Sequence, residues 1–273
     1  MTIIQAIILG IVQGLTEFLP ISSSAHLVLV PFWFNWKLSA DQAFVFNVLV
    51  QMGTLVAVII YFSKDLLKIF QAFFKGLAIK KPFENSESRL GWFIILATIP
   101  GGLAGLLLKD QVEEIFSNPF VVIGFLILTA LLLALAERFG NKVRTVEKMT
   151  PLDAIIIGVF QAAAIFPGIS RSGTTISGSL FRKFTREAAA RFSFILSIPI
   201  MLAAGLIGVI DLFQLPSLTE FLPIMIIGFV VSGIIGYLAI AWLMKFLANR
   251  PLYTFSIYCV FAATLTLVIH YVR

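Results

Sequence analysis

Six long runs of the chain contain no Asp, Glu, Lys or Arg and are predominantly apolar. They cover residues 43–62, 92–108, 115–136, 192–210, 221–244 and 251–272, with 17 to 24 residues each. A helix of about 20 residues crosses a hydrocarbon layer about 30 Å thick. The pattern therefore predicts an all-α integral membrane protein with six transmembrane helices.

Two further apolar stretches, residues 2–34 and 153–181, are interrupted near their middles. The interruptions are Leu19-Pro20-Ile21-Ser22 and Phe166-Pro167-Gly168-Ile169-Ser170. Proline removes a backbone donor and stops a helix, so each stretch predicts a re-entrant helical hairpin. Non-helical backbone at membrane depth is tolerated only where it is buried in protein or lines a wet cavity. The two broken tips therefore mark a candidate site.

An internal repeat relates these hairpins, because residues 2–24 match residues 150–172 at a constant offset of 148 positions. Ten of the 23 aligned positions are identical, where apolar bias alone would give about two or three. The sequence thus predicts a single membrane domain with repeat one at residues 1–148 and repeat two at residues 149–273. Each repeat holds a hairpin and three crossings, and an odd number of crossings forces opposite orientations, as in inverted-repeat transporters.

Composition excludes a soluble globule, because 59% of residues are hydrophobic and only 12% are charged, against about 25% charged in soluble domains. Most of the Lys and Arg residues behind the net charge of +6 lie in every second loop between the predicted spans, and therefore on one side of the membrane. These residues are Lys64, Lys68, Lys75, Lys80, Lys81, Arg89, Arg138, Lys142, Arg144, Lys148, Arg182, Lys183, Arg186, Arg191, Lys245 and Arg250. The positive-inside rule places these loops in the cytoplasm. Both termini and the loops near residues 110 and 216 are then outside.

This distribution explains the basic charge without a nucleic acid partner, because cytoplasmic loops face anionic lipid. The expected surroundings are the lipid bilayer, and the oligomeric state is left open, with a homodimer as one option. A single cysteine, Cys259, lies within the last run, so we expect neither a disulfide framework nor a thiolate metal cluster.

The first hairpin tip combines an acidic residue with hydroxyls and a potential base. Gln13 and Glu17 are four residues apart and share a helix face. Ser22, Ser23 and Ser24 follow, and His26 lies in the first turn of the next predicted helix. The repeat aligns Glu17 with Ile165, Ser23 with Arg171 and His26 with Thr174, so the two tips have diverged in their chemistry.

The second tip has the features of an anion site. A helix that starts after the Pro-Gly turn offers free N–H groups to a phosphate, and Arg171 adds a planar fork suited to phosphate oxygens. The candidate phosphate-binding residues are Ser22, Ser170, Arg171, Ser172, Gly173, Thr174 and Thr175.

Two alternatives remain open at this point. Glu17 and Arg171 could form a structural intramembrane pair, although a functional role is the default for such charges. The broken helices, the inverted repeat and the anion site also fit a secondary transporter.

The two tips carry motifs that resemble the bacterial undecaprenyl-pyrophosphate phosphatases of the bacitracin-resistance type. Gln13 and Glu17 match the pattern of Glu or Gln, three residues and Glu, and Ser22, Ser23 and His26 match Ser-Ser-x-x-His. The pattern Pro-Gly-x-Ser-Arg-Ser-x-x-Thr is met by Pro167, Gly168, Ser170, Arg171, Ser172 and Thr175. The resemblance covers the whole chain.

This resemblance implies hydrolysis of undecaprenyl pyrophosphate in the bacterial cell membrane, at a site open to the outer face. The reaction recycles the lipid carrier of peptidoglycan synthesis, a cell-wall role, and confers resistance to the antibiotic bacitracin. The resemblance also implies assistance by a divalent cation, Mg²⁺ or Ca²⁺, with Glu17 and Gln13 as the candidate ligands. Because Glu17 is the only nearby carboxylate in the sequence, substrate phosphates would have to complete the ion's shell.

For the reaction itself we expect Ser23 to be the nucleophile, with His26 as the base that accepts its proton and Glu17 positioning His26 or the ion. Arg171 would neutralise the pyrophosphate. In the alternative, His26 attacks directly or activates water. If the protein is instead a transporter, the resemblance implies a carrier that flips a polyprenyl phosphate across the membrane.

Overall fold

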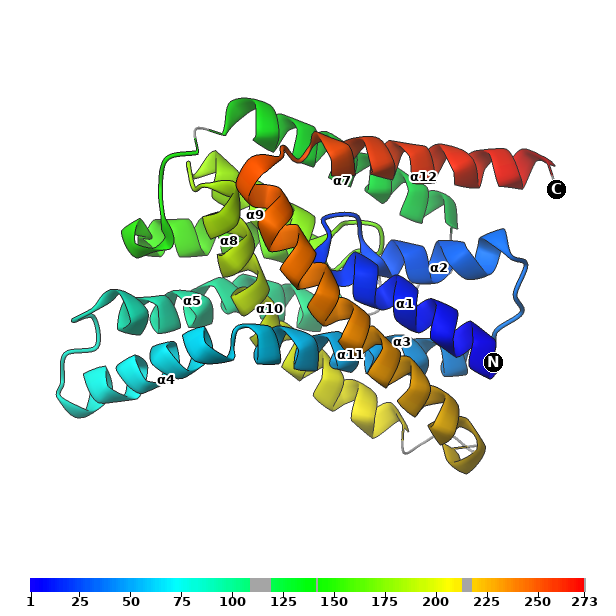
Figure 1. The fold of residues 1–273 in the computed structure, drawn as a ribbon, viewed down its shortest axis with the longest axis horizontal. Coiled ribbons are helices and arrows are strands. Elements are labelled where there is room, and N and C mark those ends of the chain that lie inside the picture. Colours follow the sequence, from blue (N-terminus) through cyan, green and yellow to red (C-terminus); the bar gives the residue numbers. More distant parts are fainter. Residues whose placement is uncertain (109–118, 141, 213–217, 273) are drawn as a thin grey trace.

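The computed structural model describes residues 1–108, 119–140, 142–212 and 218–272. Its helices are α1 (Ile3–Phe18), α2 (Ser23–Trp33), α3 (Ala40–Tyr61), α4 (Ser63–Ala78), α5 (Ser86–Leu107), α7 (Pro119–Phe139), α8 (Pro151–Ala163), α9 (Arg171–Phe181), α10 (Arg186–Leu212), α11 (Leu218–Asn249) and α12 (Tyr253–Val272). A short 3₁₀ turn, η1 (Val146–Lys148), precedes α8. Within these ranges the only strand-like contact is an isolated bridge between Arg144 and Phe184. The all-helical prediction is confirmed (Figure 1).

The predicted spans correspond to five helices that are long and apolar enough to cross a membrane, or six when the bent pair α3 and α4 counts as one. The five are α5, α7, α10, α11 and α12. The axes of α3 and α4 meet at 75°.

Residues 63–78, expected as part of a basic loop, instead form α4. The reason is their amphipathic spacing, because Leu67, Phe70 and Phe74 recur every three to four residues on one exposed face.

Both predicted hairpins are present as helix pairs with a non-helical tip. α1 and α2 flank residues 19–22, and α8 and α9 flank residues 164–170, with α8 starting at Pro151, two residues before the expected boundary. Matched residues start the matched helices. Thr2 and Thr150 each form a capping box, and Ser22 and Ser170 cap α2 and α9.

The two hairpins also pack in matched ways. α1 lies along α11, and its counterpart α8 lies along α5. Two aligned glycines permit these close approaches, because a Cβ at Gly10 would lie 2.9 Å from the Gly228 carbonyl oxygen, and one at Gly158 would lie 2.6 Å from that of Ala97. Small residues at such crossings let membrane helices approach closely.

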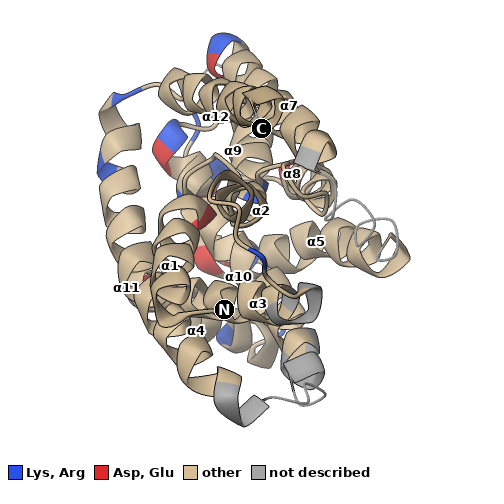
Figure 2. Cartoon of the chain, turned by 90° about the vertical axis from the view of Figure 1, so that its right-hand side faces the viewer, with Lys and Arg blue, Asp and Glu red and all other residues tan. Residues whose placement is uncertain are grey.

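The basic loops meet one another at one end of the molecule. Arg191 pairs with Asp65 at 3.1 Å, which joins the start of α10 to the start of α4. Glu137 near the end of α7 pairs with Arg186 and Lys142 and accepts a hydrogen bond from the Leu252 N–H. Both termini lie at the opposite end (Figure 1). Viewed from that end, most of the ribbon is uncharged (Figure 2). The predicted outer loops around residues 110 and 216 fall outside the described residues.

Asp153 is the centre of a second ion-pair network at this basic end. Its fully buried carboxylate accepts hydrogen bonds from Arg144 and Arg182, both at 2.6 Å, and from Thr150 at 2.8 Å. Arg144 also lies 4.6 Å above the ring of Phe184. The network fastens the segment before α8 to the end of α9. Burial alone would raise the pKa of Asp153, but the hydrogen bonds from Arg144, Arg182 and Thr150 lower it to about 2.

We predict that Asp153→Asn lowers the free energy of unfolding by about 2 kcal/mol, less than the roughly 3–5 kcal/mol for a fully buried pair because both arginines are partly exposed. Because the pKa in the folded state lies below its ordinary value of 3.8, folding favours the ionised form. The advantage of wild type should therefore be constant above about pH 5 and shrink as the pH falls towards 2. Thermal unfolding of both proteins in detergent at several pH values measures this difference in stability. Asp65→Asn is the control, because it removes a more exposed ion pair. An equal Tm difference at pH 7 and pH 3 would contradict the assignment.

Candidate active site

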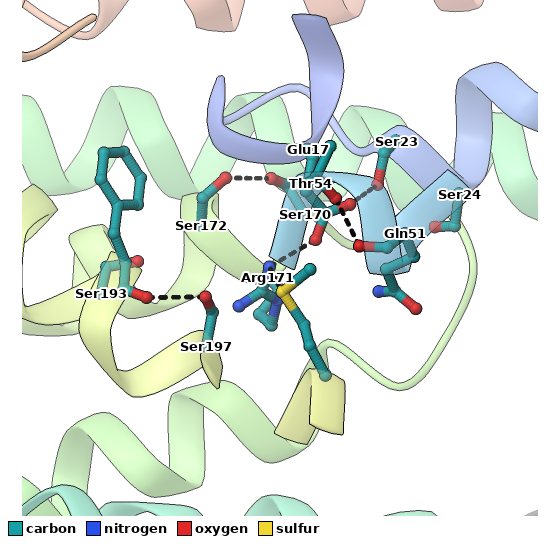
Figure 3. Close-up of polar contacts among 12 residues, drawn as sticks. Glu17, Ser23, Ser24, Gln51, Thr54, Ser170, Arg171, Ser172, Ser193 and Ser197 are labelled. Carbon is teal, nitrogen blue, oxygen red and sulfur yellow. Dashed lines mark hydrogen bonds and ion pairs between the residues drawn. The ribbon is translucent and has the colours of Figure 1, made fainter. Parts of the chain in front are cut away.

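The centre of the candidate site is the buried carboxylate of Glu17, near the end of α1. One oxygen, Oε1, accepts a hydrogen bond from Arg171 Nη2 at 2.5 Å. The other, Oε2, accepts from Ser23 Oγ at 2.6 Å and from Gln13 Nε2 at 2.8 Å. Figure 3 shows Glu17, Ser23 and Arg171 converging from the two hairpins. The two hairpin tips therefore meet at this carboxylate.

Two further contacts join the tips directly. Ser172 Oγ donates to the carbonyl of Leu19 at 3.1 Å, and the Gly168 N–H approaches Ser24 Oγ at 3.4 Å. Gly168 has a φ of +105°, a conformation that L side chains rarely adopt. This glycine allows the second tip to turn sharply enough to face the first.

Local rules explain why these side chains face one another. The spacing of Gln13 and Glu17 places both on one side of α1, where the amide of Gln13 also approaches Thr54 Oγ1 at 3.4 Å. The break after α1 ends the helix beside Glu17, and Ser22 then starts α2, which puts Ser23 at its first position. Arg171 holds the equivalent first position in α9.

The start of α9 provides part of the expected anion site. The N–H groups of Arg171 and Ser172 make no hydrogen bond within the described residues, whereas the Gly173 N–H is capped by Ser170 Oγ at 3.0 Å. Free N–H groups at a helix start are equivalent to roughly half a positive charge. Together with the guanidinium of Arg171, they favour a negatively charged group at this tip.

Three of the hydroxyls expected to bind phosphate are used differently. Thr174 and Thr175 donate to the carbonyl of Arg171, at 3.0 and 2.8 Å, and Ser172 donates to Leu19. Their protons point to backbone carbonyls, so they are not available to an anion in this arrangement. Ser22 and Ser170 act as helix caps, and each hydroxyl also lies 3.2 Å from the next-but-one serine.

His26 does not lie against Ser23, contrary to expectation. Its Nδ1 lies 2.7 Å from the carbonyl oxygen of Ser22, and its Nε2 lies 2.8 Å from the hydroxyl of Tyr258. The hydrogen-bond partner of Ser23 is Glu17. The physical reason is the helical geometry of α2, which aims a side chain three positions along back at the start of its own helix.

Sequence reasoning missed several polar residues that the fold brings to the site from other helices. Thr54 of α3 contacts Gln13, Ser193 of α10 contacts Thr175 at 2.5 Å, and Tyr258 of α12 contacts His26. Each lies in an apolar run, where isolated hydroxyls are common at helix contacts. No local motif distinguishes them.

The residues at the site do not fit a resident divalent cation in this arrangement. Both carboxylate oxygens of Glu17 already accept hydrogen bonds, and Gln13 directs its N–H towards Glu17. Within the described ranges no three His, Cys, Asp or Glu side chains lie close enough to hold a metal ion. Hard cations require several oxygen ligands, and this site supplies one carboxylate that is already neutralised by Arg171.

Comparison with known proteins relates the whole chain to one family. The family described as "Bacitracin resistance protein BacA" matches residues 6–265. The undecaprenyl-diphosphatase of Myxococcus xanthus is 43% identical over 269 residues, covering 98% of this chain and 89% of that protein. The undecaprenyl-diphosphatase of Chloroherpeton thalassium is 46% identical over 266 residues, covering 94% and 93%. That of Corynebacterium striatum is 45% identical over 262 residues, covering 94% and 91%.

We predict that the substrate-free protein binds Mg²⁺ and Ca²⁺ no more tightly than about 1 mM, the weak end of the range for oxygen-ligand sites. The reason is that Arg171 already occupies the carboxylate oxygen that an ion would need. Isothermal titration calorimetry in detergent measures the affinity. Arg171→Ala serves as the comparison, because it frees Glu17 Oε1 and should strengthen binding. Micromolar binding to the wild-type protein alone would contradict this prediction.

Proposed function

The chain belongs to the family of the bacitracin resistance protein BacA, and we propose that the contact between Ser23 and Glu17 is the reacting centre of its undecaprenyl-diphosphatase activity. The reaction converts undecaprenyl diphosphate into undecaprenyl phosphate and inorganic phosphate. The observation that carries this proposal is the 2.6 Å hydrogen bond that the Ser23 hydroxyl donates to Glu17, beside Arg171.

In the first step, Glu17 accepts the proton of Ser23 as the hydroxyl oxygen attacks the terminal phosphorus. A bond forms between Ser23 Oγ and phosphorus, the anhydride bond breaks, and undecaprenyl phosphate leaves. Glu17 replaces His26 as the proposed base, because it is Glu17 that lies within hydrogen-bond reach of the nucleophile. Water then attacks the phosphoserine, Glu17 returns its proton to the Ser23 oxygen as the bond from that oxygen to phosphorus breaks, and inorganic phosphate leaves with the protons of the water.

Arg171 has two roles in this scheme. Without substrate it is the counter-ion of Glu17. When a diphosphate arrives, its charge competes for the guanidinium, whose fork matches phosphate oxygens, and the free N–H groups of Arg171 and Ser172 lie at the same tip. Transfer of Arg171 to the phosphate leaves Glu17 Oε1 without its donor, so substrate binding itself prepares the base. Divalent cation assistance stays a prediction, and no step above depends on it.

We further propose that the basic end of the molecule faces the cytoplasm and that the two repeats have inverted orientations in a bacterial cell membrane. The support is the meeting of the basic loops at one end, with both termini at the other. The matched packing of α1 on α11 and α8 on α5 supports the repeat. Two further expectations stay predictions: that the site opens to the outer face of the membrane, and that the protein forms a homodimer.

We predict that the purified protein in detergent releases phosphate from undecaprenyl diphosphate. Detergent abolishes vectorial transport, so this assay separates a hydrolase from a carrier. Ser23→Ala should lower the rate at least about 10³-fold, because it removes the nucleophile, and Glu17→Gln should lower it by about 10²-fold or more. Ser24→Ala is the matched control, since the neighbouring hydroxyl has no contact with Glu17 in the described residues. Ser23→Ala with more than a tenth of the wild-type rate would rule out Ser23 as the nucleophile.

We predict that Arg171→Lys does not restore activity. An ammonium replaces a two-pronged donor by a point charge, and loss of one such donor costs about 10²-fold in kcat. Steady-state kinetics measure the effect, with Arg182→Lys as the control at a guanidinium outside the site. A lysine variant with near-normal turnover would show that Arg171 acts only as the counter-ion of Glu17.

A further inference from the structure

His26 is held by a hydrogen bond on each ring nitrogen. The Ser22 carbonyl is only an acceptor, so Nδ1, 2.7 Å away, must carry the proton and donate. In the neutral ring, Nε2 is then the acceptor, and the Tyr258 hydroxyl at 2.8 Å donates to it. The two rings are stacked with centroids 5.5 Å apart. The Ser22 carbonyl therefore selects the tautomer of His26, and Tyr258 fixes the plane of its ring.

The residue that accepts from His26 has an unusual backbone. Ser22 has a φ of +69°, in the left-handed region that a serine rarely adopts. Its side chain caps α2 through the Ala25 N–H. Such a conformation persists only where its surroundings impose it. Because Ser23 follows directly, the backbone of Ser22 sets the direction from which the Ser23 hydroxyl meets Glu17.

The second repeat shows what the tip does without this strain. Ser170, aligned with Ser22, has a φ of −72°. Thr174, aligned with His26, also donates from its side chain to a carbonyl at the start of its own helix, that of Arg171. His26 thus also bonds a backbone carbonyl at the start of its own helix, one position earlier than its repeat partner does, and its ring is long enough to reach α12 as well.

We infer that His26 and Tyr258 form a clamp that positions the nucleophile: Tyr258 fixes the His26 ring, and His26 Nδ1–H holds the strained carbonyl of Ser22. Both are positioning residues, and neither exchanges a proton with substrate. This inference rests on the proposed function, in which Ser23 attacks and Glu17 is the base.

Substitutions at His26 separate positioning from proton transfer. His26→Asn keeps a donor at the covalent position of Nδ1 but cannot act as a base at neutral pH. His26→Ala removes the donor. We expect His26→Asn to keep kcat within about tenfold of wild type, whereas His26→Ala loses about 10²-fold, the cost of a small misplacement of a reacting group. KM should change less than threefold in both, because neither variant removes a phosphate contact.

The role of Tyr258 is tested by a double-mutant cycle. Tyr258→Phe keeps the stacking and removes one neutral hydrogen bond, so kcat should fall about fivefold. In the His26→Asn background the same change should have no effect, because asparagine has no acceptor at the Nε2 position. Tyr253→Phe is the matched control, a tyrosine of α12 with similar exposure and no hydrogen bond from its hydroxyl within the described residues.

Two outcomes would overturn the clamp. One is a folded His26→Asn variant as inactive as His26→Ala, since that indicates proton transfer by His26. The other is a Tyr258→Phe effect of equal size in both backgrounds, which indicates that the hydroxyl acts elsewhere.

Amide hydrogen exchange at the start of α2 tests the clamp without an activity assay and without any His26 variant. Tyr258→Phe should speed exchange of the Ala25 and His26 amides, which bond to Ser22, and unchanged exchange also contradicts the clamp. If Tyr258→Phe speeds exchange as expected but the wild-type protein releases no phosphate, the proposed function fails while the hold of His26 and Tyr258 on the Ser22 backbone stands.

Discussion

The buried pairing of Glu17 with Arg171 is the interaction on which the site depends. A lone charge in this apolar surrounding would be costly, and a partner from the other hairpin removes much of that cost. The pair forms only if the α1–α2 and α8–α9 hairpins break at matched positions and their tips come into contact. The proline breaks, the serine caps and the turn at Gly168 all serve this meeting. The packing of α1 on α11 and of α8 on α5 then holds each hairpin in place.

The same pairing connects stability to chemistry. A carboxylate that is permanently neutralised by a guanidinium is a poor base, and an arginine that is permanently neutralised by a carboxylate is a poor anion site. In the proposed mechanism, a substrate with several negative charges removes both obstacles, because it draws Arg171 away from Glu17. The single carboxylate at the tips would then hold the hairpins together before substrate arrives and accept a proton from Ser23 afterwards.

Two other buried carboxylates have a structural role. Asp153 and Glu137 each pair with two basic side chains at the basic end of the molecule and join loops that are far apart in the chain. The hydrogen bonds of Asp153 fasten the start of α8 to the end of α9, away from the tip that joins the other two ends of these helices. The molecule thus separates these anchoring ion pairs, at the basic end, from the candidate site, at the tips.

The sequence by itself determined the helical class, the spans, both hairpins, and Glu17, Ser23 and Arg171 as residues that meet. These follow from local causes: hydrophobic length, proline breaks, helix spacing and the repeat. It did not determine that α4 is a helix beside a sharp bend, since its charges indicated a loop. Nor could it determine the partners of Ser23 and His26, because the choice between Glu17, Tyr258 and a neighbouring serine depends on how α1, α2 and α12 are oriented. Contacts between residues 232 positions apart, such as that of His26 with Tyr258, have no local signal; only the packing of the helices decides them.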